Sequence, residues 1–250
     1  MKKLALLLSV FALTFTSCSS GGDDSSETTD PNAVLPKKVV SEDADGEFTD
    51  NFFYNGTKLT KIESSDGQKS VFTYTGDLIT KVETFYDGEL DLTELYTYDS
   101  SGRLISYTTD YADFFSNQET YVHNANGTIS FTRTEDGEVY STGVFTMVGN
   151  DILNVVSNYD FGFGPVTTTN TYTYDNKFTP FKNITGYKWY AFAGSENVGS
   201  GFDHNVLTFT DSETSSNNVS STYTYNALNF PVSNTYTEGS QTYIETVTYN

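Results

Sequence analysis

A short tyrosine-centred motif recurs along this chain and constrains its fold more than any other feature. In each copy two aromatic residues flank a threonine, and the second aromatic is followed by turn-forming residues; clear copies are Phe72-Thr73-Tyr74, Tyr96-Thr97-Tyr98, Tyr172-Thr173-Tyr174 and Tyr223-Thr224-Tyr225. The second aromatics Tyr54, Tyr74 and Tyr98 are separated by 20 and 24 residues. A period in the twenties is typical of stacked supersecondary units.

Each unit is predicted to be a β-hairpin, so the chain is expected to be all-β. Aromatic residues and threonine alternate before the turn, as in Val71-Phe72-Thr73-Tyr74-Thr75, and pairs such as Asp87-Gly88 and Asp136-Gly137 favour two-residue turns. The alternation gives an antiparallel sheet one aromatic face, which must be covered. The sheet is therefore expected to be curled on itself or packed as two layers. We expect one buried face to hold the repeated tyrosines, Tyr74, Tyr98, Tyr174 and Tyr225.

The repeats also resemble a known family. Tyr96-Thr97-Tyr98-Asp99-Ser100-Ser101-Gly102-Arg103-Leu104 is similar to the YD repeat of the RHS superfamily, Tyr-x-Tyr-Asp-x-x-Gly-Arg-Leu. The copies that end in Pro180-Phe181 and Pro231-Val232 resemble a variant found in uncharacterised lipoproteins of the Bacteroidota. This likeness covers most of residues 50–250 and implies a YD/RHS-like meander of hairpins, without an activity. RHS proteins are very long chains that wrap a closed β shell around a toxin domain, and this chain is expected to be too short to enclose cargo.

The amino terminus has the features of a signal peptide over residues 1–17. Lys2 and Lys3 precede an apolar run from Leu4 to Phe15, and Cys18 follows two small residues. About 12 apolar residues are fewer than the roughly 20 that a spanning helix needs, so a signal peptide is favoured over a retained membrane anchor.

Cys18 is predicted to carry a lipid. The cleavage site resembles a lipobox, with Phe15 where leucine is usual, and the alternative is an ordinary secretory signal with a coincidental cysteine. Residues 18–33 are predicted to form a lipidated, disordered polar tether, and residues 34–250 a single repetitive β domain. Asp23 and Asp24 resemble the export signal that sends lipoproteins of the Bacteroidota to the cell surface. We therefore expect a lipid-anchored outer-membrane location, facing outward, with the membrane as a partner.

Charge restricts the partners of the protein. The net charge of −20 becomes −22 once the signal peptide removes Lys2 and Lys3, which makes nucleic acid an unfavourable partner. Calcium is the cation considered, because Asp43, Asp45 and Glu47 place carboxylates around a glycine. A solvated charged segment is the favoured interpretation of those residues, and no cofactor is expected.

No catalytic residue is predicted from the sequence. His123 and His204 are the only histidines; His123 occupies a repeat aromatic position, and there is no Gly-x-Ser-x-Gly or His-Glu-x-x-His motif. The densest aromatic cluster, Tyr187, Trp189 and Tyr190, is the candidate ligand contact because flat rings bind sugars. The favoured interpretation is that these rings alternate along a strand and fill the core.

The sequence thus predicts a non-enzymatic exported lipoprotein that serves as a β-repeat scaffold or binding module at the cell surface, with a protein or glycan as its ligand. The alternative is a glycan-active hydrolase or glycan-binding lipoprotein of an outer-membrane uptake system.

Overall fold

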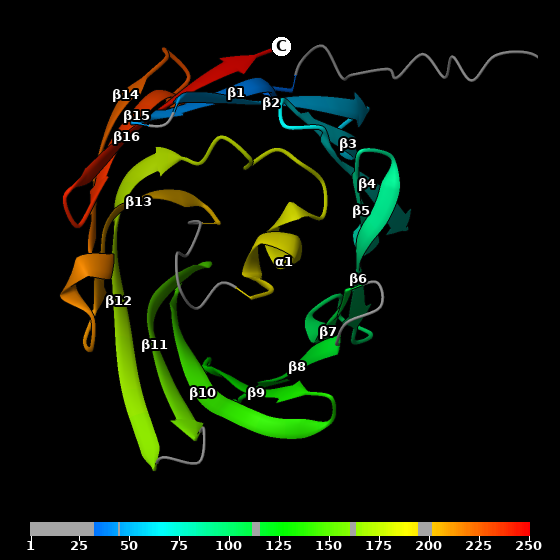
Figure 1. Ribbon diagram of the computed structural model, residues 1–250, viewed down its shortest axis with the longest axis vertical. Helices are drawn as coiled ribbons and strands as arrows, with labels where there is room; N and C mark the ends of the chain where they lie inside the picture. The colour runs from blue at the N-terminus through cyan, green and yellow to red at the C-terminus, as the bar shows by residue number, and fades with distance from the viewer. Residues whose placement is uncertain (1–32, 45, 112–115, 161–163, 195–201) are drawn as a thin grey trace, which may run out of the picture.

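The protein is a closed barrel of sixteen antiparallel strands in a computed structural model that describes residues 33–44, 46–111, 116–160, 164–194 and 202–250 (Figure 1). The strands are β1 (Pro36–Asp43), β2 (Gly46–Asn55), β3 (Lys58–Ser64), β4 (Gln68–Thr75), β5 (Leu78–Tyr86), β6 (Glu89–Tyr98), β7 (Leu104–Tyr111), β8 (Ser116–His123), β9 (Ile129–Glu135), β10 (Glu138–Val148), β11 (Asp151–Asp160), β12 (Pro165–Phe178), β13 (His204–Asp211), β14 (Val219–Tyr225), β15 (Pro231–Glu238) and β16 (Gln241–Tyr249).

Closure comes from the pairing of the first strand with the last. Each strand pairs with the next along the chain, and β1 also pairs with β16, where Val39 lies opposite Val247. The all-β class and the antiparallel hairpins are confirmed. The prediction of a curled or two-layered sheet is wrong, because pairing of the two edge strands closes the sheet into a barrel and leaves no free edge.

The inner face of the barrel carries the core. Buried aromatic rings project inward from alternate positions of the strands, including Phe72, Tyr96, Tyr121, Phe145 and Tyr172. Of the repeated tyrosines, Tyr74, Tyr98 and Tyr174 are partly buried and pack against this core, and Tyr225 is partly buried as well. The predicted common face is therefore confirmed for Tyr74, Tyr98 and Tyr174, although the first aromatic of each motif is buried more deeply than the second in the copies at 72, 96 and 172.

The repeated tyrosine hydroxyls tie hairpins together. Tyr54 donates to the carbonyl of Pro36 at 2.7 Å, Tyr98 to that of Ile79 at 2.6 Å, and Tyr174 to that of Ile152 at 2.7 Å. Each acceptor lies at the start of an earlier odd-numbered strand, 18 to 22 residues back along the chain. In the fourth copy of the motif, Tyr121-Val122-His123, histidine takes the place of the second aromatic, and its Nε2 atom lies 2.8 Å from the carbonyl oxygen of Leu104. These hydrogen bonds account for the recurrence of an aromatic residue with a polar tip at the second aromatic position of the motif.

The outer face is largely polar, with single exposed apolar side chains such as Leu95, Val122 and Val144. One row of directly paired residues crosses seven strands from β6 to β12, and its members are Thr97, Ser106, Thr120, Thr132, Thr142, Asn158 and Thr167. A second row on this face pairs Val71 with Glu83 and Thr93 with Asp110. Barrels that cross membranes carry an apolar band on their outer face. This barrel instead buries its largest aromatic cluster inside and carries hydroxyl and charged groups over most of its outer face.

The chain between β12 and β13 enters the barrel and supplies the helix α1 (Tyr187–Phe192), which lies inside the ring of strands in Figure 1. Tyr190 packs on Phe72 at 5.3 Å and Tyr96 at 6.0 Å between ring centroids. Phe192 packs on Tyr121 at 5.3 Å and Phe145 at 4.8 Å. The helix therefore fills the lumen beside β4 to β10. Among the described residues, no helix is both long enough and apolar enough to cross a membrane.

The entry of α1 depends on Gly186. Its backbone is left-handed, with φ of 76°, and a Cβ there would lie 2.6 Å from the carbonyl oxygen of Asp77. Only glycine combines that conformation with such a close approach to the wall. The expectation that Tyr187, Trp189 and Tyr190 alternate along a strand is wrong, because this turn leads into a helix.

Candidate ligand-binding cavity

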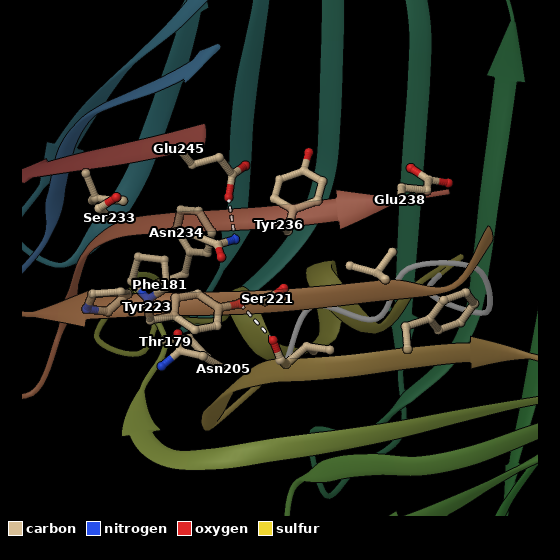
Figure 2. Close-up of a pocket in the computed structure, with 16 residues that line it drawn as sticks. Thr179, Phe181, Asn205, Ser221, Tyr223, Ser233, Asn234, Tyr236, Glu238 and Glu245 are labelled. Atoms are coloured by element: carbon tan, nitrogen blue, oxygen red, sulfur yellow. Dashed lines mark hydrogen bonds between the residues drawn. The ribbon is translucent and has the colours of Figure 1, made fainter. Parts of the chain in front are cut away.

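A cavity of about 340 Å³ lies under β13 to β16, on the side of the lumen that α1 does not fill (Figure 2). Its volume falls within the roughly 300 to 1,000 Å³ of small-molecule sites. The walls combine polar and apolar side chains, namely Thr179, Pro180, Phe181, Asn205, Val206, Phe209, Val219, Ser221, Tyr223, Pro231, Ser233, Asn234, Tyr236, Glu238, Glu245 and Val247.

Strand alternation explains which residues reach the cavity. On β15, Asn234, Tyr236 and Glu238 alternate with outward threonines, and β16 supplies Glu245 and Val247 in the same way. In the register of these strands Asn234 lies opposite Glu245. The cavity wall is therefore a continuous patch of inner-face positions, whereas the residues of 179–181 approach from the segment inside the barrel.

Asn234 and Glu245 form the polar centre of this wall. The Asn234 Nδ2 group donates to Glu245 Oε2 at 3.1 Å, as the dashed line in Figure 2 shows. Burial raises the pKa of Glu245 above its ordinary value, and the bond from Asn234 offsets part of that rise. The Asn234 Oδ1 atom is buried and has no hydrogen-bond partner. The wall thus presents acceptors that the protein satisfies only in part.

Aromatic rings border these acceptors. Tyr236 stacks on Tyr243, with centroids 4.8 Å apart and an interplanar angle of 13°, so its ring is held in place. Tyr223 donates its hydroxyl to the carbonyl of Val206 at 2.9 Å. Burial, followed by the negative charge of Glu245, raises the pKa of Tyr236 to about 12. The described lining residues include two carboxylates and no basic side chain, so the cavity carries a negative potential.

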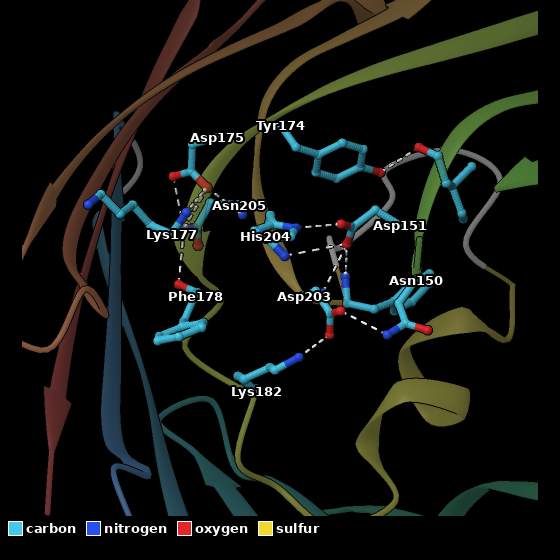
Figure 3. Close-up of polar contacts among 12 residues, drawn as sticks. Asn150, Asp151, Tyr174, Asp175, Lys177, Phe178, Lys182, Asp203, His204 and Asn205 are labelled. Carbon is cyan, nitrogen blue, oxygen red and sulfur yellow. Dashed lines mark hydrogen bonds and ion pairs between the residues drawn. The ribbon is translucent and has the colours of Figure 1, made fainter. Parts of the chain in front are cut away.

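A second polar cluster joins the lumenal segment to the barrel (Figure 3). Asp151 Oδ1 accepts backbone N–H bonds from Phe202 at 3.0 Å and Asp203 at 2.9 Å, and Asp151 Oδ2 lies 2.7 Å from His204 Nδ1. Asp203 in turn pairs with Lys182 and accepts from Asn150. These bonds link β11 with the residues on either side of α1. The Asp151–His204 pair therefore helps to hold the segment that contains α1 against the barrel wall.

The residues predicted as ligand contacts lie elsewhere in the lumen. Trp189 is partly buried, with its ring 5.4 Å from Phe192 and 5.5 Å from His123 between centroids. Tyr187 and Tyr190 are partly buried on the same helix, and none of the three lines the cavity. The structure therefore does not bring this cluster together with the Asn234–Glu245 wall.

The other predicted sites are only partly described. Asp43 Oδ1 accepts from the backbone N–H of Gly46 at 3.1 Å, and Glu47 lies opposite Glu42 in the β1–β2 ladder. Asp45 and Cys18 lie outside the described residues. Within the described part of the chain, no group of three or more His, Cys, Asp or Glu side chains is arranged to hold a metal ion.

Sequence reasoning missed Asn234, Tyr236, Glu238 and Glu245. A signal was present, because Asn234-Thr235-Tyr236-Thr237-Glu238 alternates with the same period as the other repeats. Its threonines mark the outward face, so the opposite positions had to point inward. That signal was not specific, because inner-face positions of other strands also carry polar residues, among them Glu119, Arg133 and Asn170.

Fold and site together define a closed meander barrel with a helix in its lumen and a cavity beside that helix. No protein-family model matches this chain, and no curated protein matches it. A solved structure with the same fold is the crystal structure of a porin-like protein from Bacteroides uniformis, with 13% sequence identity and a TM-score of 0.51. The match covers 86% of this chain and 96% of that one. At this identity the likeness shows the fold alone.

Proposed function

We propose that this protein is a non-enzymatic binding lipoprotein, held to the outer membrane through Cys18, that takes a small ligand into the cavity under β13 to β16. The cavity carries the proposal, because it combines a ligand-sized volume with a buried acceptor that the protein leaves without a donor. It offers a carboxylate, an amide and aromatic rings, which are groups suited to holding a ligand in one orientation.

The two faces of the barrel support a location outside the lipid. Its polar outer rows would be costly in lipid, where lipid-facing positions need apolar side chains. We therefore place the barrel in water beside the membrane, with acyl chains on Cys18 as the anchor and residues 18–33 as the tether. The description of the Bacteroides uniformis structure as porin-like supports an outer-membrane location, and the Asp23-Asp24 pair supports the outward face.

The anchor is tested by replacing Cys18 with alanine. The variant should lose incorporated palmitate and leave the outer-membrane fraction, because no acyl chain can then be attached. The measurement is palmitate labelling followed by membrane fractionation, with Ser19→Ala as the control that keeps both label and location. A Cys18→Ala protein that keeps its label and stays in the outer membrane would refute the anchor.

The cavity is tested by filling it. Ser221 lies on its wall, so Ser221→Phe should abolish the binding of fragments that occupy the wild-type cavity, because the new ring takes their volume. Thr222→Phe adds the same ring one residue away on the outer face of β14 and should preserve binding. Ligand-observed NMR with a fragment library measures both. Fragments that bind the wild type and Ser221→Phe equally well would show that the cavity is not the binding site.

A further inference from the structure

We infer that the ligand of this cavity is a small organic cation, with a primary ammonium head bound by Glu245 and Asn234 and an apolar body lying against the hydrophobic part of the wall. This inference rests on the proposed function, since it names the chemical class that the same cavity selects.

The first argument is a comparison of three inner-face glutamates. Glu119 accepts two bonds from the Arg133 guanidinium, at 2.9 and 3.2 Å. Glu94 Oε1 accepts from the hydroxyls of Tyr96 at 3.1 Å and Tyr107 at 2.7 Å. Glu245 receives one bond among the described residues, from the neutral amide of Asn234. Glu94 and Glu119 thus each accept two hydrogen bonds, whereas Glu245 at the cavity accepts one.

The missing donors match an ammonium group. The Glu245 carboxylate accepts one hydrogen bond, from Asn234, and the buried Oδ1 atom of Asn234 accepts none, so both groups can take a further donor. An ammonium group offers three N–H donors and no acceptor, which suits such a site. A ligand rich in acceptors, such as a carboxylate or phosphate, would instead face like charge.

Charge and ring placement support the same choice. Glu238 and Glu245 are the charged residues of the described lining, and the chain as a whole has a net charge of −20. Tyr236, fixed by its stack on Tyr243, lies beside Glu245 on the neighbouring strand and can present its ring to a cation (Figure 2). The remaining wall, with Val206, Phe209 and Val247, is apolar and fits a hydrocarbon body.

The test compares two probes of nearly the same shape, 2-phenylethylamine and 2-phenylethanol, by titration calorimetry on the mature protein at neutral pH. The amine should bind at least about tenfold more tightly, because charged hydrogen bonds are stronger than neutral ones. Glu245→Gln should weaken amine binding by about 10- to 100-fold and leave the alcohol unchanged. Glu94→Gln, the same change at an inner-face glutamate outside the cavity, should leave the affinity for the amine at its wild-type value.

Other outcomes are decisive as well. Equal binding of the two probes, or an amine preference that survives Glu245→Gln, would overturn the inference. If Ser221→Phe still abolished binding of both probes, the cavity would stand as the binding site and only the ligand class would fall. Failure of the amine to bind the wild type would also overturn the inference. Should Glu245→Gln not fold, Asn234→Ala removes the unpaired acceptor and should weaken the amine about threefold to tenfold.

Discussion

Replacing Phe192 with alanine is expected to lower the free energy of unfolding by about 3 to 5 kcal/mol, the usual effect of truncating a buried phenylalanine. Phe192 is fully buried at the end of α1. Its ring contacts Tyr121, Phe145, Trp189 and Phe202 at centroid distances between 4.8 and 5.8 Å. Because these rings come from both walls and lumen, the cavity left behind cannot collapse easily.

Urea denaturation measures this effect, and Trp189 reports on its location. The chain has one tryptophan, and its ring packs edge-on against Phe192, so native fluorescence should shift to longer wavelength as water enters the space. Tyr86→Ala is the control, since Tyr86 is 51% exposed and its loss should change stability by less than about 0.5 kcal/mol. A Phe192→Ala protein as stable as the wild type would show that α1 does not hold the lumen together.

Local features of the fold were predictable from the sequence because local chemistry determines them. The turns at Asp87-Gly88 and Asp136-Gly137 have positive φ at both residues, as two-residue hairpins with this sequence require. The alternation of aromatic residues with threonine places the rings on one face for the same reason. Strand type, turns and the buried face thus follow from contacts between residues close in sequence.

Closure was not predictable in this way. It depends on β1 pairing with β16, and β1 (Pro36–Asp43) contains two lysines, two acids and no repeat motif. The alternation of aromatic residues with threonine indicates only that one face of the sheet is covered. Either a second sheet or closure of the sheet into a barrel would cover that face. The long-range pairing also creates a lumen, and sixteen strands make it wide enough to admit part of the chain's own loop.

The site was hidden for a related reason. The cavity exists because α1 packs against β4 to β10 and leaves the inner face of β13 to β16 uncovered. The aromatic density around Trp189 led the sequence analysis to α1, the helix that fills the lumen, as the candidate ligand contact. The sequence around Asn234 and Glu245, where a ligand would be recognised, has no distinctive composition. The two residues become recognisable as a site only when the pairing of β15 with β16 places them opposite each other.

The buried ion pair between Glu119 and Arg133 should be the most sensitive polar contact of the wall. Both side chains are 5% exposed, and two hydrogen bonds join them. Arg133→Met is expected to lower the free energy of unfolding by about 3 to 5 kcal/mol, because it leaves the Glu119 carboxylate buried without its cation. The double variant Glu119→Leu/Arg133→Met should recover most of that loss, since no uncompensated charge remains.

Urea denaturation of the two single variants and the double variant measures this coupling. Lys81→Met provides the control, because Lys81 and Glu83 form an ion pair on the outer face at 2.8 Å, where water solvates both groups. An exposed pair contributes about 0 to 1 kcal/mol, so its loss should be small. The opposite pattern, with Arg133→Met harmless and the double variant strongly destabilised, would mean that the packing of these side chains, and not their charge, stabilises this part of the barrel.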